Sequence, residues 1–222
     1  AVFAREAFPV FLSPFTAIPL WRRAGLAGLK GHAPLKLLGL VLLGSVPAAV
    51  IGLLFEKQIE ELTDKPFIVA LFLATNGLML LLAHLWSKRR QRRHSGELKQ
   101  VPGATDSVLI GLGQAAAILP GISRSGSTIS IAVARGIDRN SAGVFSFLLF
   151  VPAIAGAALL QVLKLVRHGG ADFVPAYHVT GFLAALVIGY FALRLLVSML
   201  KSGRFHWFGW YCLAAAAVWA IA

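Results

Sequence analysis

The sequence predicts an all-α integral membrane protein, folded as a polytopic bundle of helices. Of its 222 residues, 58% are hydrophobic and only 14% are charged, and the mean hydropathy is +0.77. A soluble domain of this length could not hide so much apolar surface. Long uncharged segments alternate with basic loops, as in chains that cross a bilayer several times.

The uncharged segments define the expected membrane spans, since a helix needs about 20 residues to cross the hydrocarbon layer. The first segment is the least helix-like, because each of its three prolines removes a backbone hydrogen bond. Residues 56–65 are expected to form a polar loop. The chain is predicted to be one domain over residues 1–222, with spans at 7–21, 37–55, 67–86, 142–163, 179–200 and 205–222 and a re-entrant segment at 107–134.

The re-entrant segment is predicted from two apolar stretches that are each too short to cross a membrane. Residues 107–118 carry no charge, but about a dozen residues fall short of the span length. A polar stretch containing Pro120 and Gly121 follows, and residues 129–134 are apolar again. Non-helical backbone at this depth is tolerated only where protein buries it or where it lines a cavity. We therefore expect a helix-loop-helix that enters and leaves on one side.

The tip of this helix-loop-helix has the chemistry of an anion site. Arg124 is a charge where charges are costly, which favours a functional role, and its planar guanidinium suits phosphate oxygens. Ser123 or Ser125 can cap the second half-helix, whose free N–H groups would then face the cavity. The alternative is a Pro/Gly break stabilised by local hydroxyl groups. Those hydroxyl groups belong to Ser123, Ser125, Ser127 and Thr128.

The distribution of basic residues predicts the orientation. Alternate loops carry 14 lysines and arginines on one side of the membrane and 4 on the other. Basic residues concentrate in cytoplasmic loops. Both ends of the re-entrant segment therefore face the cytoplasm, and its tip points toward the outer face.

Several other classes of function are disfavoured. The net charge of +12 is explained by cytoplasmic loops, so it predicts no nucleic-acid partner. Cys212 is the only cysteine, which excludes a disulfide framework and a thiolate metal site. Residues 111–116 fit a dinucleotide fingerprint by spacing but follow no strand, so their small residues are expected to serve close helix packing. His84, near a basic loop, is interpreted as an interfacial residue.

Residues 120–129, with the sequence PGISRSGSTI, resemble the signature of the undecaprenyl-diphosphate phosphatases, the bacitracin-resistance family. The similarity extends to Gln114 and to residues 145–149 (FSFLL), 151–152 (VP) and 43–55 (LGSVPAAVIGLLF), and covers the chain from about Trp21 onward. This resemblance implies a hydrolase of the bacterial cytoplasmic membrane that recycles the lipid carrier of peptidoglycan synthesis, with roles in cell shape and bacitracin resistance. It also implies that the fold is a remnant of an inverted-repeat architecture.

The resemblance further implies the site residues. Ser123, Arg124 and Thr128 would bind the diphosphate and take part in catalysis. A divalent cation, Mg²⁺ or Ca²⁺, is expected from the family, although this chain shows no ligands for it. The expected partners are a polyprenyl diphosphate lipid and the membrane, with a homodimer left open. The full expected substrate-binding set is Gln114, Gly121, Ser123, Arg124, Ser125, Gly126, Ser127 and Thr128.

The chain departs from the family at one point that leaves two alternatives open. Members carry an earlier motif of two glutamates followed by Ser-Ser-Thr-Gly-His, and nothing here matches it. Either the chain is truncated or mis-started, or it is a divergent protein with half a site. Hydrolysis of polyprenyl diphosphate and binding or translocation of a polyprenyl phosphate without hydrolysis both remain consistent with the sequence, because broken helices also occur in transporters.

Overall fold

The computed structural model describes residues 4–14, 32–93, 98–167 and 175–221. The secondary structure of these residues is helical, apart from one isolated bridge between Lys99 and Ile137. The helices are α1 (Ala4–Phe11), α3 (Ala33–Leu54), α4 (Glu56–Thr63), α5 (Pro66–Arg93), α6 (Ala104–Ala116), α7 (Arg124–Ala134), α8 (Arg139–Arg167), α9 (Pro175–Lys201) and α10 (Trp207–Ile221).

Four of the described helices are long and apolar enough to cross a membrane. They correspond to the ranges Ala33–Leu54, Pro66–Arg89, Arg139–Lys164 and Val179–Lys201, each with a hydropathy above 2. The prediction of an all-α polytopic membrane protein is therefore confirmed.

The structure differs from the sequence interpretation at three segments. The described part of 7–21 lies in and after α1, which has 8 residues and is too short to span a bilayer; the remainder of that range lies outside the described residues. Residues 56–65 do not form a loop, because 8 of them form the amphipathic helix α4. The range 205–222 contains α10, which has only 15 residues.

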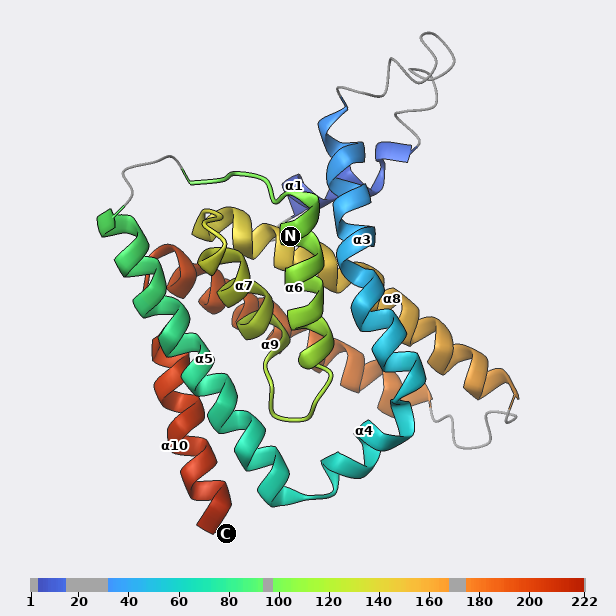
Figure 1. Ribbon diagram of the computed structural model, residues 1–222. Coiled ribbons are helices and arrows are strands. Elements are labelled where there is room, and N and C mark those ends of the chain that lie inside the picture. The colour runs from blue at the N-terminus through green and yellow to red at the C-terminus, as the bar shows by residue number, and fades with distance from the viewer. Residues whose placement is uncertain (1–3, 15–31, 94–97, 168–174, 222) are drawn as a thin grey trace, which may run out of the picture.

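Helices α6 and α7 form a hairpin inside the bundle (Figure 1). Both open ends of the hairpin lie where α5 ends and α8 begins, while the loop between its helices points toward the end of the bundle where α4 lies. We call the first the basic end, since Lys99, Arg135 and Arg139 lie there, and the second the opposite end. The structure thus has the predicted helix-loop-helix, of 13 and 11 residues.

Small residues let the hairpin pack closely against α3. A Cβ added to Gly111 of α6 would lie 2.1 Å from the carbonyl oxygen of Gly44 of α3, and a Cβ on Gly44 would lie 2.9 Å from the carbonyl oxygen of Ser107. Real Cβ atoms essentially never lie this close to another atom. A larger residue in place of Gly44 or Gly111 would therefore force α3 and α6 apart. The expected role of residues 111–116 in helix packing is confirmed at Gly111.

Apolar side chains complete the packing of the hairpin. Ile110 of α6 and Ile129 of α7 are 0% and 2% exposed, and they join Phe145 and Leu148 of α8 in one buried cluster. The hairpin is therefore enclosed by protein on these sides, as polar backbone at membrane depth requires.

A buried carboxylate closes the hairpin at its basic end. Asp106, at the start of α6, is 2% exposed; it accepts hydrogen bonds from Lys99 Nζ and from Arg135 Nε, each at 2.8 Å, and from the Gly103 N–H at 3.2 Å. Burial alone would raise the pKa of Asp106, but these donors outweigh it and lower the pKa to about 2. Because Arg135 follows α7, this one side chain ties the two ends of the hairpin together.

Asp106 should therefore contribute stability that is lost in acid. An aspartate in the unfolded chain has a pKa of about 3.9, so the contribution is complete above about pH 4 and disappears as the pH falls toward about 2. We expect Asp106→Asn to lower the free energy of unfolding at neutral pH by roughly 2 kcal/mol. Thermal unfolding in detergent, followed by circular dichroism across this pH range, measures both effects.

The matched control is Asp64→Asn, which removes an exposed carboxylate at the opposite end. It should leave the acid profile of the parent unchanged. A parent-like profile for Asp106→Asn would show that the carboxylate does not hold the hairpin.

Candidate functional site

The site is built on the first turn of α7, at the tip of the hairpin. Ser123 caps this helix: its Oγ accepts a hydrogen bond from the Gly126 N–H at 3.1 Å, and its carbonyl oxygen accepts one from the Ser127 N–H at 2.9 Å. The N–H groups of Arg124 and Ser125 remain at the open end of the helix, where the dipole favours anions. Of the two serines that the sequence offered as the cap, Ser123 is the one that caps α7.

Two glycines allow the chain to make this turn. Gly121 has a φ of 95°, and a Cβ there would lie 2.6 Å from the carbonyl oxygen of Val69 on α5. A Cβ on Gly126 would lie 3.1 Å from Oδ1 of Asn76. Both glycines belong to the expected binding set, and both serve the close approach of the tip to α5.

Asn76 fixes the tip from α5 and was not expected from the sequence. Its side chain is 1% exposed; Oδ1 accepts a hydrogen bond from the Ser123 N–H at 3.2 Å, and Nδ2 donates to Cys212 Sγ of α10 at 3.3 Å. Because the oxygen and the nitrogen of this buried amide are both hydrogen-bonded, Asn76 orients Ser123, the residue that caps α7. Its only signal in the sequence is a lone amide inside the uncharged span 67–86.

Arg124 points into a cavity between α7, α8 and α9. The cavity has a volume of about 380 Å³. Arg124 is half-buried, and its Cζ lies 5.1 Å from the centre of the Phe150 ring, within the range of a cation–π contact. The polar lining comes from Arg124, Ser125 and Ser146, and the remaining lining is Ile129, Gly143, Phe147, Phe150, Gly189, Ala192, Leu193 and Leu196.

A second cavity lies on the other side of the tip, between α5, α7, α9 and α10. It has a volume of about 240 Å³ and includes Ser123, Ser125, Asn76 and Tyr211 in its lining. Ser125 borders both cavities, and its Oγ lies 3.5 Å from the Ser123 Oγ. The tip therefore presents the Arg124 guanidinium to the first cavity, the Ser123 hydroxyl to the second and the Ser125 hydroxyl to both.

Thr128 is placed differently from Arg124 and Ser125. It is fully buried; its Oγ1 lies 2.9 Å from the Arg124 carbonyl oxygen, to which it donates, and 2.6 Å from Ser146 Oγ on α8. It lines neither cavity. Thr128 therefore fastens α7 to α8 behind the tip.

Gln114 and Ser127 are buried at 1% and 2% exposure and also line neither cavity. The amide atoms of Gln114 and the Oγ of Ser127 have no hydrogen-bond partner among the described residues. Buried polar groups are normally paired, so these two mark a polar interior within the hairpin. Of the expected binding set, the structure brings Ser123, Arg124, Ser125 and Gly126 to the cavities.

The described residues at the tip do not fit a divalent-cation site. No acidic side chain lines either cavity, and within the described ranges no three His, Cys, Asp or Glu side chains gather closely enough to bind a metal. Mg²⁺ and Ca²⁺ prefer carboxylate ligands. The chemistry of the tip is that of hydrogen-bond donors and a guanidinium.

Residues 5–218 match the family model described as bacitracin resistance protein BacA. The chain belongs to the BacA family. The family expected from residues 120–129 is thus confirmed, and the match begins at residue 5, upstream of the similarity from about Trp21 onward.

Curated relatives of this BacA-family chain carry the name undecaprenyl-diphosphatase. The protein of Geobacter metallireducens is 38% identical over 195 residues, which are 87% of this chain and 70% of that protein. The protein of Methanothermobacter thermautotrophicus is 39% identical over 177 residues, which are 79% of this chain and 94% of that protein. The protein of Moorella thermoacetica is 37% identical over 183 residues, and this chain spans 66% of its length.

Replacing Asn76 should loosen the tip of this BacA-family chain. Asn76→Leu removes the acceptor of the Ser123 N–H and leaves a part-buried donor unpaired, which costs about 1–3 kcal/mol. We expect a lower unfolding midpoint and weaker binding of a lipid diphosphate, measured in detergent by differential scanning fluorimetry and by titration.

Thr75→Val is the matched control, because the exposed Thr75 hydroxyl donates only to Leu71 of its own helix. The control should bind as the parent does. If Asn76→Leu binds lipid diphosphate with the affinity of Thr75→Val, Asn76 does not position the site.

Proposed function

We propose that this chain is a membrane undecaprenyl-diphosphatase, which releases the terminal phosphate of undecaprenyl diphosphate and so recycles the lipid carrier for cell-wall synthesis. Membership of the BacA family and the name shared by its relatives support this activity. The observation that carries the proposal is Arg124 at the N-terminus of α7, facing a cavity whose remaining lining is mostly apolar.

The cavity matches the two-part chemistry of a lipid diphosphate. Its polar end offers the Arg124 guanidinium and the Ser125 hydroxyl, while Phe147, Phe150 and Leu193 offer an apolar wall. A volume of about 380 Å³ holds a diphosphate and the first isoprene units and leaves the rest of the chain to the bilayer. The diphosphate would therefore lie at Arg124, with the hydrocarbon leaving between α8 and α9.

The tip can stabilise the charge that moves during cleavage of a phosphoanhydride. As the P–O–P bond breaks, negative charge develops on the transferring group and on the leaving phosphate oxygen. Arg124 and the open N–H groups of α7 are positioned before the reaction and need no reorganisation. Ser123 and Ser125 add hydroxyl donors, and Thr128 holds the turn against α8. These residues bind and stabilise; none of them is a general base.

A second candidate function is binding or translocation of a polyprenyl phosphate without hydrolysis. One observation favours it: within the described part of the chain neither a carboxylate nor an imidazole lines the two cavities at the tip, so these lining residues offer no group that would activate water. A divalent cation, if hydrolysis uses one, would need its carboxylate ligands from outside the lining residues. A homodimer is not needed for the site, because one chain forms both cavities.

The membrane placement is part of the proposal. The excess of basic residues at one end supports a chain whose basic end faces the bacterial cytoplasm and whose tip opens toward the outer leaflet of the cytoplasmic membrane. In this orientation the site meets lipid diphosphate on the outer side.

Arg124 should be required for binding and turnover. Arg124→Ala removes a charge contact that costs about 2–5 kcal/mol when truncated, so affinity for undecaprenyl diphosphate should fall by about thirtyfold or more. Arg124→Lys keeps the charge but loses the planar guanidinium, so its affinity should lie between that of the parent and that of Arg124→Ala. Binding and phosphate release are measured on the purified chain in proteoliposomes.

Arg194→Ala is the control, because Arg194 is an exposed arginine of α9 that contacts Tyr190, with its Cζ 5.5 Å from the ring centre. It should bind and turn over as the parent does. Unchanged affinity in Arg124→Ala would mean that the tip is only structural. Tight binding by the parent with no phosphate release would favour the second candidate function.

The orientation predicts which residues an external reagent reaches. Gln100 and Asn140 are exposed at the two ends of the hairpin, so Gln100→Cys and Asn140→Cys should both resist an impermeant thiol reagent added outside cells. Asp64→Cys, at the opposite end, should react. Each is made in a Cys212→Ala background, and labelling of either hairpin cysteine from outside contradicts the orientation.

A further inference from the structure

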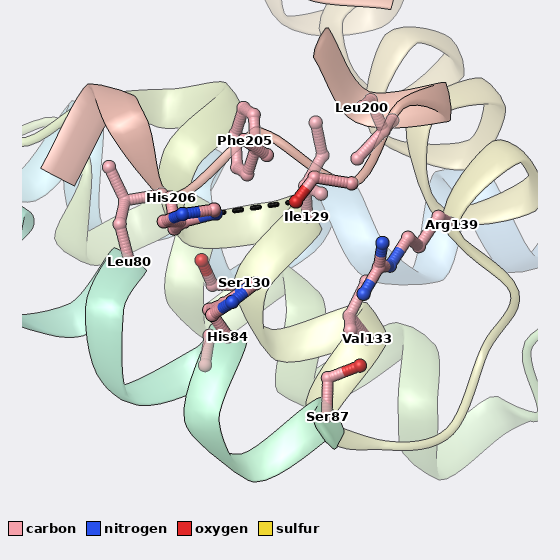
Figure 2. A pocket seen from close by; sticks show the side chains of 12 residues that line it. Leu80, His84, Ser87, Ile129, Ser130, Val133, Arg139, Leu200, Phe205 and His206 are labelled. Atoms are coloured by element: carbon pink, nitrogen blue, oxygen red, sulfur yellow. Dashed lines mark hydrogen bonds between the residues drawn. The ribbon is translucent and has the colours of Figure 1, made fainter. Parts of the chain in front are cut away.

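A third cavity lies at the far end of α7 from Arg124, at the basic end of the bundle. Figure 2 shows side chains that converge on it from α5, from α7, from the first residue of α8 and from the segment between α9 and α10. Its volume is about 30 Å³, which is more than the roughly 10–15 Å³ that one water needs. Its polar lining consists of His84, Ser87, Ser130, Arg139 and His206.

Two histidines from distant parts of the chain meet at this cavity. The rings of His84 and His206 are stacked, with their centroids 3.9 Å apart and their planes at 28°. His206 Nδ1 lies 3.3 Å from the Gly203 carbonyl oxygen (dashed in Figure 2). Donation by Nδ1–H would leave Nε2 free for another partner. The sequence interpretation of His84 as a merely interfacial residue does not account for this pairing.

Ser130 gives an independent sign that the cavity takes a ligand. The residue is 4% exposed, and its Oγ has no hydrogen-bond partner among the described residues. Its hydroxyl lies near both imidazoles in the lining of this cavity (Figure 2). A buried hydroxyl without a partner costs about 1–3 kcal/mol, so a ligand that accepts its hydrogen bond would be stabilised.

The charge of the lining selects an anion over a metal ion. Among the described residues, no acidic side chain lines the cavity, and the Arg139 guanidinium does. Rings stacked face to face do not direct their nitrogen lone pairs at one point, and the guanidinium would repel a cation. Arginine, serine and histidine together offer hydrogen-bond donors on several sides, and arginine in particular matches phosphate oxygens.

We propose that this cavity binds a small oxyanion with the chemistry of a phosphate group, held by Arg139, Ser130 and the two imidazoles. The size of the cavity excludes a nucleotide or a sugar. The site is distinct from the tip: Arg124 and Ser130 are six residues apart on α7, or about 9 Å along the helix axis. The proposal does not depend on the proposed function, because the only lining residues it shares with the cavities at the tip are the apolar residues Leu80, Ile129 and Phe205.

The test is a titration of the purified full chain with inorganic phosphate, followed by the imidazole ¹⁵N resonances of the histidines. His84→Asn and His206→Asn assign the two signals. Both signals should shift in a saturable manner in the parent. Arg139→Gln should weaken the phosphate affinity by about tenfold or more, and Ser130→Ala by a few-fold.

Arg124→Gln separates this cavity from the tip and should leave the shifts unchanged. Arg139→Lys retains the positive charge and serves as a control for misfolding of Arg139→Gln. Its affinity for phosphate should be lower than that of the parent and higher than that of Arg139→Gln. Absence of a saturable shift in the parent would overturn the proposal. Parent-like affinity in both Arg139→Gln and Ser130→Ala, or loss of the shifts in Arg124→Gln alone, would also overturn it.

A second arm distinguishes free phosphate from a lipid headgroup. The same spectra are recorded without inorganic phosphate in two kinds of nanodisc, one of phosphatidylcholine alone and one that also contains phosphatidylglycerol. Shifts that appear with phosphatidylglycerol and block the phosphate titration assign the site to a lipid phosphate. Shifts that require inorganic phosphate in both kinds of nanodisc assign it to the free ion, and no shift under any of these conditions overturns the site.

Discussion

The hairpin depends on the hydrogen bonds that Asp106 accepts at its base. A half-length helix pair cannot be held by the membrane as a spanning helix is, so its open ends need a lock within the protein. Asp106 supplies it by joining Lys99 and Arg135, the residues that flank α6 and α7, at 2.8 Å each. The bridge between Lys99 and Ile137 continues the same closure along the backbone. Because the open ends of the hairpin are held together, the loop between α6 and α7 can remain inside the bundle.

The position of Arg124 follows from how α7 is held on two further sides. Asn76 of α5 binds the Ser123 N–H, and Ser146 of α8 shares a hydrogen bond with Thr128. Both partners contact α7 within its first turns, so the cap and the helix axis are fixed while the Arg124 side chain remains directed at the cavity. A guanidinium placed this way is organised before any ligand arrives, which is the condition for strong electrostatic stabilisation in a water-poor site.

The sequence predicted those features that arise from local composition. Apolar length predicted six spans, and four of them are helices long enough to cross a membrane. The Pro/Gly break with its hydroxyl groups predicted the hairpin and a cap at Ser123 or Ser125, and the structure selects Ser123. It could not predict contacts between distant segments, such as Asn76 with Ser123 or His84 with His206, because a neutral polar residue inside a span carries no periodic signal. The family resemblance gave Thr128 as a binding residue, and the structure adds its contact with Ser146, which is visible only once α8 is placed. The helix α4 was missed because its charges resemble those of a loop.

The central claim is that the diphosphate of the lipid lies against the Arg124 guanidinium. Rotational-echo double-resonance NMR between ³¹P of bound undecaprenyl diphosphate and ¹⁵N-labelled arginine side chains, on the chain in lipid bilayers, measures this proximity. The account predicts strong dephasing of one guanidinium signal, and its loss in Arg124→Lys but not in Arg194→Lys. Dephasing that persists in Arg124→Lys, or that is absent from the parent, would contradict it.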